Sequence, residues 1–157
     1  MRRYNVQGCV MIDRSVIGKS WPVKAIVPEE GALRFFAKAT GETNPVYSDL
    51  KAARSAGYPH LPVPPTYLFS LEMLAPSDSF WLDDLGLPLE KILHAEQSFE
   101  YRNMVYAGEK LTIETRISDA YEKKGGLLEF YVREMTIRNS NGTECAILKT
   151  TLVVRHG

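Results

Sequence analysis

The second half of the chain alternates hydrophobic and polar residues in long runs. This alternation, rich in β-branched and aromatic residues, runs through residues 91–103, 109–121, 127–139 and 144–155. A side-chain period of two residues is typical of strands. The segments between the later runs contain Lys-Gly-Gly and Asn-Gly sequences, which favour hairpin turns. The pattern therefore predicts three or four long antiparallel strands.

Two of these segments indicate which residues share a face of the sheet. In residues 109–121, the alternating set is Leu111, Ile113, Thr115 and Ile117. In residues 127–139, the set begins at Leu128, Phe130 and Val132 and continues through Ile137. We expect the first set to share one face, and the alternation of Leu128, Phe130 and Val132 to do the same, because successive strand residues point to opposite sides.

The first half has helix and turn signals instead. Residues 21–27 alternate and predict one strand, and residues 28–41 predict a helix with a stripe formed by Leu33, Phe35, Phe36 and Ala39. Asp49 is placed to cap a short helix that ends at Gly57. A third helix, from Pro65 to about Leu74, is apolar on nearly every side, which favours a buried position.

These elements predict an α+β fold, with an antiparallel sheet wrapped around one long central helix. At 157 residues the chain is long enough for one domain and short for two. We therefore expect a single domain over residues 1–157, with residues 1–14 as an N-terminal extension.

Composition and charge exclude several classes of function. Apolar residues make up 45% and charged residues 24%, and 19 basic residues balance 19 acidic ones. This balance favours neither a nucleic acid nor an anionic membrane as partner. There is no run of the ~18 apolar residues that a membrane helix needs and no signal peptide, so we expect a cytoplasmic protein with Cys9 and Cys145 reduced.

Two stretches resemble one known family. TGETNPVYSDLKAARSAGYPHLPVPPTYLFS, residues 40–70, resembles the MaoC family of enoyl-thioester hydratases and dehydratases, whose loop reads Gly-Asp-x-Asn-Pro-x-His. HAEQSFEYRNMVYAGEKLTIETRISDAYEKKGG, residues 94–126, is similar to the N-terminal-type branch of that family. The resemblance covers about residues 15–155 and implies a hot-dog fold. In this branch the domain often forms half of a two-hot-dog unit, as in the mycobacterial hydroxyacyl-ACP dehydratase heterodimers.

The resemblance also implies a chemistry. In active members the loop Asp and His activate a water that adds to C3 of a trans-2-enoyl thioester, while C2 receives a proton. Such a step needs a group that titrates near the working pH. A backbone N–H at the start of the hot-dog helix holds the developing enolate oxygen.

The corresponding residues here are changed. Glu42 stands at the Asp position, Asn44 is retained, and Tyr47 stands at the His position. A tyrosine titrates near 10 and is therefore a poor base at neutral pH. Pro65 stands where the family has the glycine whose N–H meets the thioester oxygen, and proline has no N–H. Losing one such donor costs on the order of 3 kcal/mol of transition-state stabilisation.

By the same resemblance, the candidate catalytic residues are Glu42, Asn44 and Tyr47. The candidate substrate-binding residues are Val63, Pro65, Thr66 and Tyr67. The expected ligand is an acyl thioester of CoA or acyl carrier protein, with no other cofactor. The histidines His60, His94 and His156 are dispersed, so no metal site is expected.

Several interpretations remain open at this stage. The first is an acyl-binding subunit of a (3R)-hydroxyacyl-thioester dehydratase that needs a catalytic MaoC-like partner. The second is a stand-alone homodimeric enoyl-CoA hydratase that uses Glu42 and Tyr47, and the third is a non-enzymatic acyl-thioester binder. A dimer is expected in all three, because a single hot-dog sheet leaves one edge strand unpaired. Asn44-Pro45 as a simple turn and His94 as a structural residue are the plain alternatives.

Overall fold

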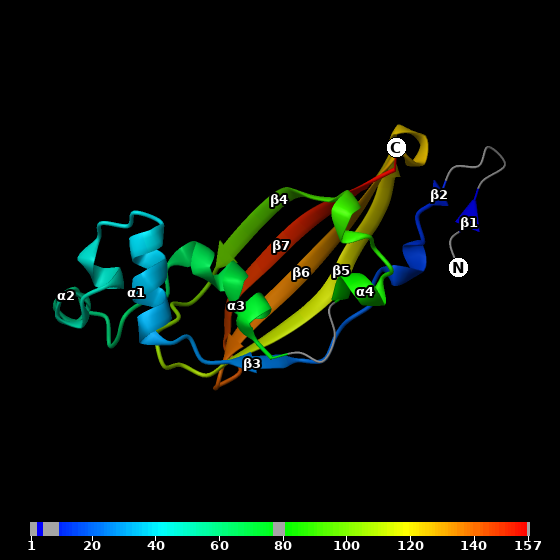
Figure 1. The fold of residues 1–157 in the computed structure, drawn as a ribbon. Helices are drawn as coiled ribbons and strands as arrows, with labels where there is room; N and C mark the ends of the chain where they lie inside the picture. Colours follow the sequence, from blue (N-terminus) through cyan, green and yellow to red (C-terminus); the bar gives the residue numbers. More distant parts are fainter. Residues whose placement is uncertain (1–2, 5–9, 77–80, 157) are drawn as a thin grey trace.

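The computed structural model describes residues 3–4, 10–76 and 81–156, and its main feature is a five-stranded antiparallel sheet (Figure 1). The order of the strands is β3-β5-β6-β7-β4. Their bounds are Lys24–Ile26 for β3, Ile92–Tyr101 for β4, Leu111–Lys123 for β5, Leu128–Asn139 for β6 and Glu144–Arg155 for β7. A separate pair, β1 (Arg3–Tyr4) and β2 (Val10–Met11), is also antiparallel. The four long strands predicted from the alternation are confirmed, whereas the strand expected at residues 21–27 is only three residues long.

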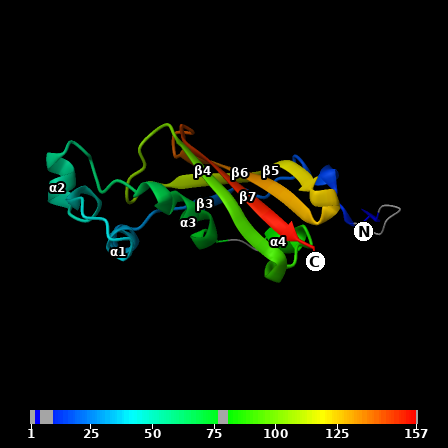
Figure 2. The ribbon, with the colours of Figure 1, turned by 90° about the horizontal axis from the view of Figure 1, so that it is seen from above.

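The helices gather on one face and at one end of this sheet. Helices α3 (Leu68–Leu74) and α4 (Trp81–Asp84) lie on the same face, while α1 (Glu30–Ala39) and α2 (Leu50–Ser55) lie towards one end (Figures 1 and 2). Short 3-10 helices occupy the connections: η1 (Arg14–Val16), η2 (Pro45–Tyr47), η3 (Pro65–Tyr67), η4 (Leu89–Lys91) and η5 (Lys124–Gly126). The α+β class is confirmed.

The expected long central helix is wrong. The segment that faces the sheet is η3 followed by the seven residues of α3, and the longest helix, α1, has ten residues and lies elsewhere. The reason is Pro76. The residue before a proline is disfavoured in the helical region, and Ala75 leaves it with ψ 133°. The helix therefore stops after two turns.

The burial of α3 also differs from the expectation of a wholly buried helix. Leu68 and Leu71 pack in the core, but Met73 is 76% exposed and Leu74 is also exposed. Glu72, one of the polar residues of the segment, is buried at 5% exposure. The last turn of α3 therefore turns apolar side chains outward and a carboxylate inward.

The apolar stripe of α1 is shifted from the predicted one. Leu33 and Ala37 are buried and Phe36 is partly buried, at helical spacings of three and four residues. Phe35 is 74% exposed and Ala39 is exposed as well. The short helix α2 follows its prediction, since the Asp49 carboxylate accepts the backbone N–H of Lys51 at 2.7 Å.

One strand face was predicted correctly and one was wrong. The inward residues of β5 are buried as expected, and they are Leu111, Ile113, Thr115 and Ile117. In β6 Leu128, Phe130 and Val132 are not the buried face. The buried set consists of Glu129, Tyr131, Arg133, Met135 and Ile137, so of the residues named for this strand only Ile137 points inward. Phe130 lies instead on the outer face, where its ring stacks on Tyr121 of β5 at 4.8 Å between centroids. The buried face of β6 includes the charged residues Glu129 and Arg133, and for this reason the hydrophobic pattern did not identify it.

Both hairpin predictions are confirmed. Strands β5 and β6 are joined through η5, and β6 pairs with β7 in antiparallel register. In the second turn Gly142 has φ 77°, a left-handed conformation that glycine adopts without strain, and its N–H donates to the carbonyl of Asn139 at 2.9 Å.

The core divides into two clusters on the helix-covered face. The larger one lies beneath α1 and α3 and includes Leu33, Leu71 and Ile113. The smaller one lies beneath α4 and includes Leu82, Ala120 and Val154. Residues of both clusters line one groove, together with the polar residues Glu72, Arg133 and Thr150.

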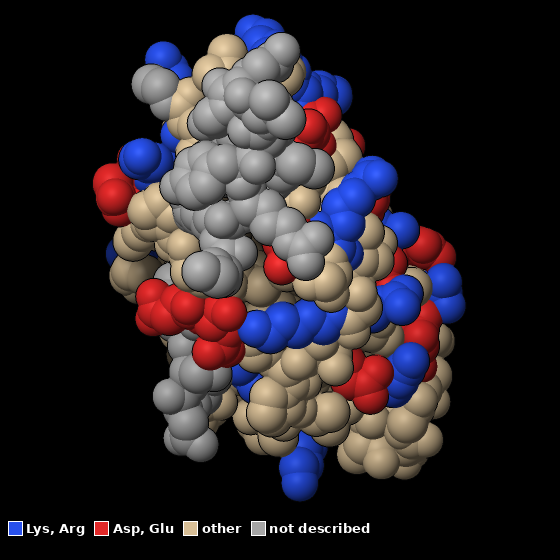
Figure 3. All heavy atoms as spheres, turned by 90° about the vertical axis from the view of Figure 1, so that its right-hand side faces the viewer, with Lys and Arg blue, Asp and Glu red and all other residues tan. Residues whose placement is uncertain are grey.

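The surface carries mixed charge. On the face shown in Figure 3, acidic and basic side chains of the described residues are interspersed. Cys145 is a buried free thiol, and Cys9 lies outside the described residues. No helix formed by the described residues is long and apolar enough to cross a membrane.

Candidate functional site

The loop that resembles a catalytic motif is held by its own side chains. Gly41 adopts φ 72° after α1, and its N–H donates to the Lys38 carbonyl at 3.2 Å. The Glu42 carboxylate accepts the backbone N–H of Asn44 at 2.8 Å. The Asn44 side-chain oxygen in turn accepts the N–H of Val46 at 3.2 Å and caps η2. Glu42 and Asn44 are both exposed and fold the loop.

Tyr47 is the one candidate catalytic residue that faces a hollow. Burial is the main factor that raises its pKa above the ordinary value of 10, and the charges of Glu42 and Tyr58 raise it further. The phenol therefore stays protonated at neutral pH. It can donate a hydrogen bond there, but it cannot act as a base.

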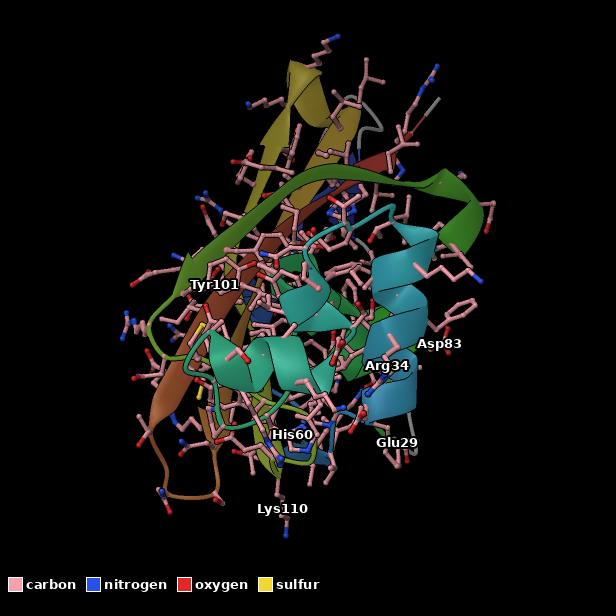
Figure 4. The ribbon with its side chains drawn as sticks, turned by 90° about the vertical axis from the view of Figure 1, so that its left-hand side faces the viewer. Glu29, Arg34, His60, Asp83, Tyr101 and Lys110 are labelled. Atoms are coloured by element: carbon pink, nitrogen blue, oxygen red, sulfur yellow. The ribbon has the colours of Figure 1, made fainter. Side chains whose placement is uncertain are left out.

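We call this depression the loop hollow; it has a volume of about 330 Å³. It is lined by residues from η2, η3, α3 and the end of β4, and they are Tyr47, Val63, Pro65, Leu68, Tyr101, Arg102, Asn103, Met104 and Val105. Figure 4 shows Tyr101 near the end of β4, on the side of the molecule where α2 lies. The sequence-based candidates Tyr47, Val63 and Pro65 are therefore brought together.

The other candidates lie outside this lining. Thr66 is exposed, and Tyr67 is buried with its ring edge-on to Phe36 at 5.0 Å between centroids. The Tyr67 N–H donates to the Pro64 carbonyl at 2.9 Å. Pro65 has no N–H, and the Tyr67 N–H is already bound to Pro64. Neither Pro65 nor Tyr67 can therefore donate to a thioester oxygen.

The rim of the loop hollow has a basic residue whose charge is already compensated. Arg102 donates from Nη2 to the Glu100 carboxylate at 2.8 Å and also forms an ion pair with Glu144. The hydrogen bond to Glu100 is the main factor that raises the Arg102 pKa. A phosphate bound here would have to compete with two carboxylates.

The raised phenol pKa values lead to a prediction on stability. Burial is the first cause that raises the pKa of Tyr47, Tyr67 and Tyr101. A phenol with a higher pKa in the folded state contributes stability that is present below the unfolded pKa, about 10, and is lost as pH rises through the folded pKa. We expect the free energy of unfolding, measured by urea denaturation, to fall above about pH 10. The fall should be smaller in Tyr47→Phe, and an unchanged pH profile in this variant would contradict the assignment.

The second and larger cavity is a groove of about 790 Å³ between the two core clusters. Helices α3 and α4 form one wall, and the inner faces of β3, β4, β6 and β7 form the other. Its main apolar lining consists of Phe69, Met73, Trp81, Leu82, Ile92 and Leu152. Its polar lining consists of Lys24, Glu72, His94, Arg133 and Thr150. Its volume lies in the range usual for small-molecule sites, about 300 to 1,000 Å³.

A buried ion pair stands in the wall of this groove. Glu72 and Arg133 are joined at 2.6 Å, and each side chain is only 6% exposed. The Thr115 hydroxyl donates to Glu72 at 3.3 Å, and the Arg133 guanidinium lies 4.4 Å from the centre of the Trp81 ring. Burial lowers the pKa of Arg133, partly offset by the charge of Glu72.

Our reading of the sequence missed this pair, although the signal was present. Glu72 is a single carboxylate inside an otherwise apolar helix, and Arg133 alternates with Tyr131 and Met135 in β6. A charge at an inward register position on each of two facing elements indicates a buried pair.

His94 also lines the groove. Its ring stacks on Phe69 of α3 at 5.6 Å between centroids, and its Nε2 lies 3.2 Å from the Glu96 carbonyl at a bulge in β4. The exposed His94 side chain thus lies on the part of the groove wall formed by the edge strand β4. Neither cavity lining places a carboxylate with a histidine in the manner of the MaoC loop, since the loop hollow contains phenols and the groove carboxylate is bound to Arg133.

Comparison with known proteins agrees with this geometry. Residues 15–148 match the family described as the FAS1-like dehydratase domain region. A UPF0336 protein of Streptomyces coelicolor is 37% identical over 109 residues, which cover 68% of this chain and 71% of that protein. A UPF0336 protein of Saccharopolyspora erythraea is 30% identical over 145 residues, 92% of each chain.

Solved structures show the same architecture. The truncated HadBC (3R-hydroxyacyl-ACP dehydratase) complex of Mycobacterium tuberculosis matches with a TM-score of 0.74 and 25% identity, covering 88% of this chain and 96% of that one. A chain of the ChsH1–ChsH2 complex of the same organism matches with a TM-score of 0.70 and 18% identity, covering 87% and 88%. The chain therefore belongs to the FAS1-like dehydratase-region family, the N-terminal type of MaoC-like hot-dog domain, together with the UPF0336 proteins.

Proposed function

We propose that this chain is the acyl-binding subunit of a (3R)-hydroxyacyl-thioester dehydratase and that a second MaoC-like subunit supplies the catalytic Asp and His. The observation that carries the proposal is the local use of the loop residues. The Glu42 carboxylate and the Asn44 amide hold the loop itself, and Tyr47 keeps its proton. Glu42 and Asn44 therefore serve the fold of the loop, and Tyr47 is not a base at neutral pH.

The groove supports an acyl-binding role. Most of its wall is apolar, and the end of α3 with the two residues that follow it, Ala75 and Pro76, belongs to its lining. Leu68 of α3 lines the loop hollow and the next residue, Phe69, lines the groove, so the two cavities lie on either side of the first turn of α3. In the proposed arrangement the thioester lies near the loop hollow and the distal carbons of the acyl chain lie in the groove. The thioester carrier is CoA or acyl carrier protein in the cytoplasm.

The edge of the sheet supports a partner subunit. Strand β4 pairs with β7 on one side only and forms an end of the sheet order. Exposed backbone groups along such an edge, with Leu93 and Tyr101 exposed beside them, offer a pairing surface. The complexes HadBC and ChsH1–ChsH2, which share the fold, are each built from two kinds of subunit.

The test is an enoyl-thioester hydration assay. The purified chain alone is incubated with crotonyl-CoA while the enoyl absorbance is followed, and Glu42→Ala serves as the matched variant. We expect no hydration above background for either protein. A longer acyl-CoA should raise the melting temperature of both, because a ligand that binds only the folded state stabilises it.

The same assay is then repeated with the catalytic subunit present. A co-expressed MaoC-like chain with an intact Gly-Asp-x-Asn-Pro-x-His loop should give hydration that depends on its own Asp and is retained with Glu42→Ala in this chain. Hydration by this chain alone that disappears in Glu42→Ala would overturn the proposal. It would favour the stand-alone hydratase that uses Glu42 and Tyr47.

A further inference from the structure

The ion pair in the groove wall is unusual for a cavity that holds only hydrocarbon. Arg133 of β6 donates from Nη1 to Oε1 of Glu72 at 3.1 Å, and its Nη2 lies 2.6 Å from the other carboxylate oxygen. Both residues lie within the lining of the groove. Taking two charges out of water is costly, and apolar residues of similar volume would often stabilise the fold as well. Fold stability alone therefore does not explain the presence of this buried ion pair.

The pairing leaves part of the guanidinium unsatisfied. Of its five N–H groups, the two bonds to Glu72 use one on each terminal nitrogen. The Arg133 Nε is buried and has no hydrogen-bond partner among the described residues. The central carbon of the Arg133 guanidinium lies 4.4 Å from the centre of the Trp81 ring, and the attraction of a cation to an aromatic face is not a hydrogen bond to an acceptor atom. The aromatic contact therefore does not replace the missing acceptor.

The charges around the groove favour an acceptor as well. Lys24 of β3 lines the same groove, and its Nζ donates only a long bond, 3.4 Å, to the Glu72 carbonyl. With Lys24 and Arg133 positive and Glu72 negative, the wall has an excess of one positive charge. The polar part of the wall thus offers more hydrogen-bond donors than acceptors.

These features distinguish two kinds of acyl chain. An unsubstituted alkyl chain in the groove would exclude water from Lys24 and from the second N–H of each terminal nitrogen of Arg133, which it cannot satisfy, and an unsatisfied buried donor is unfavourable. An oxygen on the chain could accept from these donors while the carbon atoms on either side contact Phe69, Trp81 and Leu152. A hydrogen bond to a charged group of this kind commonly changes affinity about tenfold or more.

We propose that the acyl group bound in this groove carries a hydrogen-bond-accepting oxygen, a hydroxyl, keto or carboxylate group, distant from the thioester, and that Arg133 recognises it. This inference rests on the proposed acyl-binding function and specifies its substrate class. Glu72 is the positioning residue, because it holds the guanidinium at the groove wall. The chain therefore selects oxygenated acyl thioesters over plain fatty acyl thioesters.

The test measures binding by titration calorimetry on the intact chain. Unsubstituted acyl-CoAs from butyryl to hexadecanoyl are each compared with the ω-hydroxy and ω-carboxy thioesters of the same chain length. At one or more lengths the oxygenated thioester should bind about tenfold more tightly than its unsubstituted counterpart. The double variant E72L/R133M, which replaces the pair by apolar side chains, should lose this preference and bind both kinds equally.

Two further variants make the outcome interpretable. Arg133→Lys keeps a cation beside Glu72 and preserves folding, but it lacks the planar fork and should reduce the preference. Arg116→Met removes an arginine from the outer side of β5, where Lys149 remains to pair with Glu134, and should leave the preference unchanged. If unsubstituted thioesters bind at least as tightly at every length, or if E72L/R133M keeps the preference, the inference is wrong while the acyl-binding function stands. If no acyl-CoA binds, the proposed function itself fails.

Discussion

Glu72→Ala is expected to lower the free energy of unfolding by about 3 to 5 kcal/mol, because it leaves the Arg133 charge buried without its partner. The two side chains are each 6% exposed, so little solvent reaches the Arg133 charge to compensate it when the carboxylate is removed. Urea denaturation followed by tryptophan fluorescence measures the change, since Trp81 lies against the Arg133 guanidinium.

The control for this prediction removes both charges at once. The E72L/R133M variant should unfold within about 1 to 2 kcal/mol of the wild type, because apolar replacement of a buried pair is often neutral. Arg116→Met on the outer face, where the Arg116 side chain is 60% exposed, should change stability by less than about 1 kcal/mol. A Glu72→Ala protein as stable as the wild type would show that the pair is solvated and would also weaken the inference on oxygenated ligands.

Charges introduced on the exposed edge of β4 are expected to weaken subunit association about 100-fold. Leu93 is 58% exposed and Tyr101 47% exposed on this strand, and a sheet edge that pairs with another subunit would bury both. Replacing both by Glu would place unpaired charges in the interface, and a 100-fold loss corresponds to about 2.7 kcal/mol. Sedimentation equilibrium of the chain alone, and with its catalytic partner, gives the dissociation constants.

Val23→Glu is the matched control for this prediction. Val23 is 56% exposed and immediately precedes β3, the strand at the other end of the sheet order. This variant should associate like the wild type. If the β4 variant also keeps the wild-type dissociation constant, the subunits meet on another surface and the proposed pairing edge must be abandoned.

The sequence predicted the sheet well because its signal is local. Residues 111–117 alternate regularly, and the buried set that begins at Leu111 is the one expected. The face of β6 was predicted incorrectly because charges are rarely buried, so a pattern that treats Arg133 and Glu129 as outward selects the wrong register. Partners that are distant in sequence compensate these charges: Glu72 of the facing helix pairs with Arg133, and His156 lies beside Glu129.

The candidate site was likewise predicted only in part, because some of its features depend on the three-dimensional path of the chain. The motif indicated Tyr47 and Pro65, and the fold brings both to one hollow. The hydrogen bond from the Asn44 N–H to Glu42 could not be foreseen, because it depends on the backbone path after Gly41. The end of α3 forms part of the groove, and the sequence signal for that end, Ala75 followed by Pro76, can be related to a cavity only once the helix is known to face the sheet.

The two cavities on either side of the first turn of α3 have no lining residue in common. Substitutions in the loop therefore leave the walls of the groove untouched, and substitutions in the groove leave the loop untouched. After a gene duplication, one copy of such a domain can lose its acid–base residues and still be selected for the ligand it holds. The other copy can keep the chemistry and give up the binding of long chains, so that natural selection acts on the two tasks separately.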